Sequence, residues 1–131
     1  MKNDQFERDI EVVPNNFNKL AIVNIDGENI LQGELEIIDS NGKFWGAYSV
    51  EVRGSQHYPQ QFPKLFETKN AFPKILDWHV YEGDSSCCVD VPPSELIICK
   101  NGLHVLEYIK NFAIPYFANQ KFRELEGYYL Y

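Results

Sequence analysis

Alternating apolar and polar residues run through the first half of the chain and predict β-strands. In ELEII (34–38), glutamates alternate with leucine and isoleucine, which is the two-residue period of a strand with one buried face. Segments of this kind, or short apolar runs of strand length, occur at residues 19–25, 30–39, 43–54 and 64–68. Asp-Gly and Asn-Gly turns separate the first three segments, as in hairpins. The pattern therefore predicts an antiparallel meander of four strands between Leu20 and Thr68.

The third predicted strand, KFWGAYSVEVRG (43–54), has one face that suits a core. Its alternation places on that face Phe44, Tyr48, Val50 and Val52. Trp45, Ala47, Ser49, Glu51 and Arg53 line the opposite face.

A short helix is predicted at the N-terminus, over residues 3–12. Asp4 suits its N-cap, and Glu7 three residues later completes the pattern of a capping box. Pro14 is expected to end this helix, because a proline interrupts the hydrogen-bond ladder of a helix interior.

Two further helices are predicted near the C-terminus. Apolar residues at helical spacing indicate the first, over residues 102–112. Pro115 suits the first turn of the second, over residues 115–126, and Gly127 suits the position that ends it.

The segment between the strands and these helices, residues 70–95, shows little periodicity apart from a short extended piece at two adjacent cysteines. A long irregular segment in a compact domain is usually a functional loop, or it contains an element that the pattern does not reveal. The order of elements predicts an α+β fold that forms a single domain over residues 1–131, with helices packed on one side of the sheet.

Composition and charge narrow the classes of function. Of the 131 residues, 44% are hydrophobic and 15% aromatic, which is too many for a disordered chain. Nineteen acidic and twelve basic residues give a net charge of −7, with no lysine and arginine cluster, so direct binding of nucleic acid is not expected. The start of the chain has no apolar signal region, and no apolar run has the length of a membrane span, which predicts a cytoplasmic protein without membrane contact.

The adjacent residues Cys87 and Cys88 are the main candidates for chemistry. A disulfide between neighbours is strained, because their Cα atoms lie about 3.8 Å apart, below the range of unstrained disulfides. A redox role for the pair is therefore disfavoured. On a strand, successive side chains point to opposite faces, so one thiol fills the core and the other faces outward. The pattern favours Cys88 as the outward thiol, and Cys87 is the alternative if the register shifts by one residue.

The neighbours of this pair in the sequence are acidic, namely Glu82, Asp84 and Asp90, and none is basic. An acidic environment disfavours a second negative charge on sulfur, so a self-activated protease nucleophile is not indicated. It suits the exchange of a thioester between partners, where the partner can supply positive charge.

Three motifs, in this order, resemble the ubiquitin-conjugating enzyme family. YPQQFPKLFET (58–68) is similar to the family's Tyr-Pro-x-x-Pro-Pro segment, with Phe62 in place of one proline. HVYEGDSSCCVDVP (79–92) is similar to its active-site stretch, in which Cys88 stands at the position of the nucleophile. YIKNFAIPYFANQKFRELEGYY (108–129) is similar to the C-terminal helices of the family's bacterial branch, which occurs in anti-phage operons beside cyclic-oligonucleotide synthases.

The resemblance also bears on His79. The equivalent histidine of the family holds the backbone of the active-site loop, which implies a structural role; a base toward the cysteine is the alternative. The family's His-Pro-Asn is His79-Val80-Tyr81 here, so the asparagine credited with stabilising the oxyanion is absent. Tyr81, Ser85 and Ser86 are the other candidate donors nearby.

The resemblance implies a ubiquitin-conjugating-like fold and an enzyme of antiviral defence. Such an enzyme carries a protein C-terminus as a thioester on Cys88 and passes it to an amine or a thiol. The implied partner is a cyclic-oligonucleotide synthase or a ubiquitin-like protein, bound through its C-terminus. No adenylating domain fits in 131 residues, so activation is expected to come from another protein, such as a separate activating enzyme, or from the partner's own chemistry. No cofactor is implied.

Two other classes of function stay open beside this one. The first is a catalytically inert conjugating-enzyme-like module that acts as a binding scaffold, which the missing asparagine and the acidic surroundings favour. The second is a zinc site built from some of the residues Cys87, Cys88, Cys99, His57, His79 and His104. It is disfavoured, because no Cys-x-x-Cys pair is present and adjacent cysteines chelate one tetrahedral metal poorly. Cys99, in the apolar run LIICK, is expected in the core.

Overall fold

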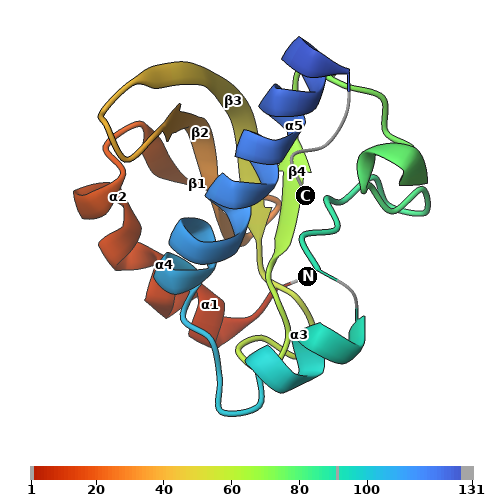
Figure 1. Ribbon diagram of the computed structural model, residues 1–131. Helices are drawn as coiled ribbons and strands as arrows, with labels where there is room; N and C mark the ends of the chain where they lie inside the picture. The colour runs from red at the N-terminus through yellow and green to blue at the C-terminus, as the bar shows by residue number, and fades with distance from the viewer. Residues whose placement is uncertain (1, 91, 128–131) are drawn as a thin grey trace.

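The fold is described from a computed structural model, and the structure describes residues 2–90 and 92–127 (Figure 1). The strands are β1 (Leu20–Ile25), β2 (Glu28–Ile38), β3 (Phe44–Arg53) and β4 (Lys64–Glu67). The helical elements are α1 (Asp4–Asp9), η1 (Ile10–Val12), α2 (Val13–Asn16), η2 (Leu76–Trp78), α3 (Pro92–Ile98), α4 (Val105–Tyr108), η3 (Ile109–Ala113) and α5 (Ile114–Glu126).

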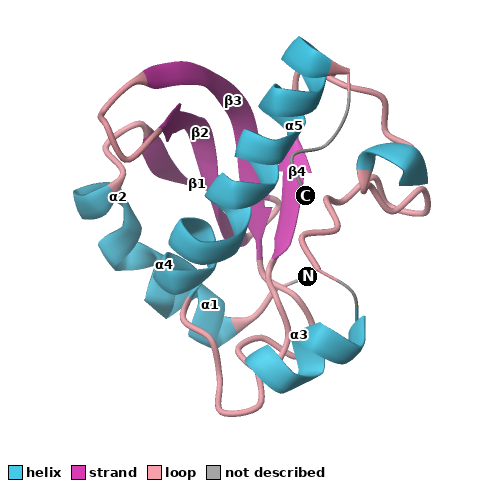
Figure 2. Cartoon of the chain, in the orientation of Figure 1, coloured by secondary structure: helices cyan, strands magenta, loops and turns pink. Residues whose placement is uncertain are grey.

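The described strands form one antiparallel sheet in the order β1-β2-β3-β4, which confirms the predicted meander. One face of the sheet is buried, because α5 crosses it (Figure 2). Phe117 of α5 stacks on Tyr48 of β3, with the ring centroids 4.7 Å apart. The alternation of β2 decides which face is covered, since Leu35 and Ile37 are buried and Glu34 is exposed. Burying each such side chain stabilises the fold by about 2 kcal/mol. With helices at both ends of the chain, the fold is α+β, as predicted.

The N-terminal helix differs from the prediction at both of its ends. Asn3, not Asp4, is the N-cap, and its side-chain oxygen accepts a hydrogen bond from the Phe6 N–H at 2.9 Å. Pro14 does not end the helix, because it lies in the first turn of α2, where a missing N–H leaves no partner unsatisfied. Helical structure therefore continues through η1 to Asn16.

The prediction that Phe44 shares a face with Tyr48, Val50 and Val52 is wrong. Its side chain is 56% exposed, whereas those of Tyr48, Val50 and Val52 are buried. The pairing of β2 with β3 shifts between Ile37 and Ile38, so that Ile37 faces Gly46 and Ile38 faces Phe44. Such a bulge inserts one residue and reverses the two-residue alternation beyond it.

Residues 70–95 contain more regular structure than predicted. They include η2, an isolated antiparallel bridge between Val80 and Cys87, and the start of α3. The sequence did not reveal α3, because a short apolar run does not distinguish a strand from a helix. Two of its apolar residues, Leu96 and Ile97, are 71% and 77% exposed, whereas Cys99 just after it is fully buried, as predicted.

The two predicted C-terminal helices form one continuous helix, in which α4, the π turn η3 and α5 follow one another without a gap. Pro115 lies in the first turn of α5, as predicted. A proline donates no N–H and its ring crowds the carbonyl four residues earlier, and the wider π turn just before it accommodates both effects. Gly127 ends α5 in the left-handed conformation, with φ 82°, as predicted.

Candidate active site

The segment that carries the adjacent cysteines lies beside β4. Val80 and Cys87 face each other in the isolated bridge, and the chain turns back between them. The Cys87 N–H donates a hydrogen bond to the Leu65 carbonyl of β4 at 2.7 Å. The Cys88 N–H donates to the His79 carbonyl at 2.8 Å. Main-chain hydrogen bonds on both sides therefore fix the backbone of the two cysteines.

The predicted alternation of the two thiols is confirmed. Cys87 is buried, with 7% of its surface exposed, and Cys88 is partly exposed. Cys87, Cys88 and Cys99 are free thiols. Burial raises the pKa of Cys87 to about 12, so this thiol stays protonated at neutral pH. Of the two neighbours, Cys88 is therefore the one placed to react.

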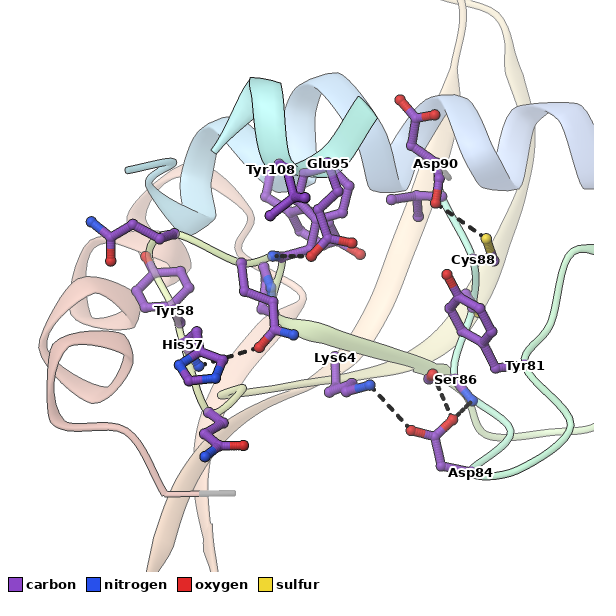
Figure 3. A pocket seen from close by; sticks show the side chains of 18 of the residues that line it. His57, Tyr58, Lys64, Tyr81, Asp84, Ser86, Cys88, Asp90, Glu95 and Tyr108 are labelled. Carbon is purple, nitrogen blue, oxygen red and sulfur yellow. Dashed lines mark hydrogen bonds and ion pairs between the residues drawn. The ribbon is translucent and has the colours of Figure 1, made fainter. Parts of the chain in front are cut away.

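The thiol of Cys88 has two polar neighbours. It donates to the Asp90 carbonyl at 3.2 Å, and the Tyr81 hydroxyl points toward it (Figure 3). The nearby Cys88 sulfur, together with burial, raises the pKa of Tyr81. The Tyr81 hydroxyl consequently keeps its proton at neutral pH and can donate it to negative charge on the sulfur or on a group bound there.

Cys88 lies where two hollows of the surface meet. A groove of about 1240 Å³ extends from His57 and Tyr58 past Lys64 to the thiol (Figure 3). A smaller hollow of about 280 Å³ adjoins it and is lined mainly by the C-terminal helix, with Asn111, Phe112, Pro115, Tyr116 and Asn119. Cys88, Val89 and Asp90 line both. A group attached to the thiol can therefore be approached from two sides.

His79 contributes to this arrangement through its backbone. It adopts the left-handed conformation, with φ 55°, directly after η2. Its carbonyl accepts the Cys88 N–H and also the Tyr116 hydroxyl, the latter at 3.1 Å. Its side chain lines the smaller hollow, as Cys88 does. The structure thus places His79 beside the thiol and gives it a part in holding the cysteine backbone.

The groove carries more negative than positive charge. Its lining includes one lysine, Lys64, and four carboxylates, those of Glu82, Asp84, Asp90 and Glu95. Lys64 Nζ lies 3.3 Å from Asp84 Oδ2, and both side chains are nearly half exposed. The sequence did not associate a cation with the cysteines, because Lys64 comes from β4, well before them in the chain. The remaining carboxylates favour the approach of a positively charged segment.

The two serines before the cysteines belong to the turn. Ser86 is buried, and its hydroxyl donates to Asp84 at 2.6 Å. Ser85 is exposed, with φ 65° and its N–H bonded to the Tyr81 carbonyl. Of the three candidate oxyanion donors named from the sequence, Tyr81 is therefore the one that contacts the thiol.

Tyr58, the first residue of the Tyr-Pro motif, connects two helical parts of the fold through its side chain. Its hydroxyl donates to Asp9 at 2.7 Å and accepts the Val105 N–H at 2.9 Å. The ring of Phe6 packs edge-on against it, with the centroids 5.4 Å apart. The motif thus joins the N-terminal helix to α4 at one end of the groove.

The other candidate metal ligands do not come together. Cys99 is in the core, and His104 caps α4 by accepting the Leu106 N–H at 3.1 Å. In the part of the chain that the structure describes, no three His, Cys, Asp or Glu side chains are arranged to hold a metal ion.

Tyr116 was not named from the sequence as a site residue, although its hydroxyl reaches the backbone before the cysteines. The one available signal was that Tyr116, Gln120 and Arg123 follow at helical spacing and therefore share a face of the helix. Such spacing does not identify what the face contacts.

Comparisons of the chain with protein-family models, with curated proteins and with solved structures gave no match. No helix within residues 2–90 and 92–127 combines the length and the apolar character that crossing a membrane requires. The function is accordingly argued from the site itself and from the motif resemblance.

Proposed function

We propose that the protein is a cytoplasmic, ubiquitin-conjugating-like transferase whose nucleophile is Cys88. The observation that carries the proposal is the placement of this thiol, which is partly exposed where a long groove and a smaller hollow meet, while its neighbour Cys87 is buried. The α+β fold, with an antiparallel four-stranded sheet and helices at both ends, supports a ubiquitin-conjugating-like architecture.

The proposed reaction is the transfer of an acyl group between sulfur atoms and then to an acceptor. The Cys88 thiolate attacks the thioester carbonyl of an activated partner, a new C–S bond forms, and the thiol of the activating protein leaves with a proton. An amine or a thiol then attacks the same carbonyl, and Cys88 leaves and regains its proton. Each step conserves the acyl group, so it requires neither oxidant nor reductant.

The two hollows suit the two participants of this reaction. An extended chain end fits the groove better than the smaller hollow, and the acceptor approaches from the other side of Cys88. The Tyr81 hydroxyl points toward the thiol (Figure 3), and in the sequence Tyr81 corresponds to the asparagine of the family's His-Pro-Asn. A donor in this position stabilises the oxyanion that forms when either nucleophile attacks.

The proposed partner is a cyclic-oligonucleotide synthase of an antiviral operon, or a ubiquitin-like protein, joined through its C-terminus. A separate activating enzyme supplies the first thioester. The surplus of carboxylates in the groove supports a partner whose terminal segment carries positive charge.

The test is coexpression with a cyclic-oligonucleotide synthase of an anti-phage operon and with an activating enzyme. The wild-type protein is expected to form an adduct with the summed mass of the two proteins, cleaved by dithiothreitol because a thioester exchanges with thiols and an amide does not. Cys88→Ser should give an ester that resists dithiothreitol, and Cys88→Ala should give no adduct.

Cys87→Ala is the matched control, because it removes the neighbouring thiol and leaves Cys88 in place. The adduct should persist, with a lower yield only to the extent that the small cavity destabilises the fold. If Cys87 were required and Cys88 dispensable, the nucleophile would be assigned to the wrong neighbour. If no adduct formed in any variant, the enzyme proposal would be refuted.

A binding module is the second candidate, and one observation favours it. The tripeptide His79-Val80-Tyr81 lacks the asparagine of the family's active site. On this proposal, the protein binds the synthase through the groove without forming a covalent bond. Copurification of the two proteins that is unaffected by Cys88→Ala, together with the absence of any adduct, would support it.

A further inference from the structure

Three side chains of α5 hold three consecutive backbone carbonyls that precede the cysteine segment. Tyr116, Gln120 and Arg123 are spaced so that they lie on one face of the helix. The Tyr116 hydroxyl donates to the carbonyls of Trp78 and His79, each at 3.1 Å.

The other two members of this row reinforce the same contact. Gln120 Nε2 donates to the Trp78 carbonyl at 2.6 Å, and Arg123 donates to the carbonyl of Asp77. The Arg123 guanidinium also lies over the Trp78 ring, 3.9 Å from its centroid. The backbone of residues 77–79 is therefore fastened to α5 at every carbonyl.

Tyr116 is the member of the row that reaches the cysteines. The His79 carbonyl that accepts its hydroxyl also accepts the Cys88 N–H at 2.8 Å. The same hydroxyl lies near the thiol of Cys87, where it opposes part of the rise that burial causes in the pKa of that thiol. One phenolic oxygen thus contacts the segment on both sides of the turn that presents Cys88.

We propose that Tyr116 is a positioning residue for Cys88. Its hydroxyl holds the His79 carbonyl, which also binds the Cys88 N–H, against α5, and it thereby keeps the Cys88 thiol at the boundary of the groove and the smaller hollow. The inference rests on the proposed function for its purpose, because positioning matters only if the thiol reacts. Its first test needs no partner.

The perturbation is Tyr116→Phe, which removes the hydroxyl and keeps the ring. The ring contacts are retained, since Tyr116 packs against Phe117 and Phe72 with centroids 5.1 Å and 6.3 Å apart. The matched control is Tyr48→Phe. Tyr48 is also buried, and its hydroxyl donates to Glu124 of the same helix at 3.0 Å, away from the cysteine segment.

The first measurement is the rate at which iodoacetamide labels Cys87 in the folded protein, with tandem mass spectrometry to assign the label. Cys87 reacts only when the segment opens, because its thiol is buried and its N–H is bonded to β4. Tyr116→Phe should raise this rate about five- to tenfold, the effect of losing one well-placed hydroxyl, and Tyr48→Phe should change it less than about twofold. Equal rates in both variants, whether raised or unchanged, would overturn the inference.

The second measurement uses formation of the adduct with the coexpressed synthase and activating protein, repeated with purified components. At saturating synthase, the rate constant should fall about tenfold in Tyr116→Phe, while the synthase concentration that gives half the maximal rate stays unchanged. A purely structural role would lower the amount of folded protein and leave the rate per folded molecule unchanged, and that result would overturn the inference. If even the wild-type protein forms no adduct, the proposed function fails, and the labelling rates alone decide whether Tyr116 holds the segment.

Discussion

Glu67, the last residue of β4, offers a sharp test of what holds the region behind the cysteines together. Its side chain is fully buried and accepts three hydrogen bonds, from the Lys69 N–H at 2.7 Å, the Ala71 N–H at 2.9 Å and Lys74 Nζ at 2.5 Å. The carboxylate therefore organises residues 68–74, which lead to η2 and the cysteine segment. Glu67→Gln removes the negative charge and keeps the size of the side chain.

The loss of stability expected for Glu67→Gln follows from these contacts. A glutamine has one acceptor oxygen, so its amide N–H₂ must face either a backbone N–H or the Lys74 ammonium, and one of the three hydrogen bonds becomes a contact between two donors. Leaving one charge of a buried ion pair without its partner costs about 3–5 kcal/mol. The Lys74 side chain is 17% exposed and can regain some water, which favours the lower end of this range. We expect a loss of about 3 kcal/mol in the free energy of unfolding, and a fall of about 10 °C in the melting temperature.

The assay is urea denaturation followed by tryptophan fluorescence, since Trp78 stacks on Phe72 in the same region, with the rings 5.8 Å apart. Glu36→Gln is the control, because its ion pair with Lys19 is long, at 3.2 Å, and exposed. It should cost less than about 1 kcal/mol. The double variant Glu67→Gln/Lys74→Met should recover about 1–2 kcal/mol of the free energy of unfolding, because the second substitution removes the unpaired ammonium. Equal losses for Glu67→Gln and Glu36→Gln would refute the reasoning.

Three further predictions concern the thiols and their neighbour. Tyr81→Phe should slow adduct formation about 100-fold without changing the melting temperature by more than a few degrees, because it removes the donor next to the reacting sulfur; an unchanged rate would exclude this role. Iodoacetamide should label Cys88 first, Cys87 far more slowly and Cys99 only on unfolding; equal protection of Cys87 and Cys88 would favour the binding module. Because the pKa of Cys87 is raised to about 12, the unfolded thiol ionises first as pH rises. The protonated Cys87 thiol therefore contributes fully to the free energy of unfolding below about pH 8.5. Between about pH 8.5 and about pH 12, this contribution falls by about 1.4 kcal/mol per pH unit. Cys87→Ala should flatten the fall of the unfolding free energy in that range, as measured by denaturation at several pH values, and an unaltered slope would contradict the assignment.

Features that depend on neighbouring residues could be predicted from the sequence. The alternation in β2 determines that Leu35 and Ile37 face the core, because a strand directs successive side chains to opposite sides. The same rule separates Cys87 from Cys88. Predictions from the spacing of apolar residues failed where the backbone departs from regular geometry, as at the bulge that turns Phe44 outward.

The tertiary structure decided which distant groups meet at the thiol. Lys64 reaches the groove from β4, and Tyr116 reaches the backbone before the cysteines from the C-terminal helix. Tyr81 is near Cys88 in the sequence, yet its contact with the thiol depends on the turn that folds the chain back on itself. A periodic pattern records only which side of an element is apolar, and that preference is the same for many possible neighbours. The hydrogen bonds that surround Cys88 are set by the relative position of β4, the cysteine segment and α5, which is determined only when these elements pack together.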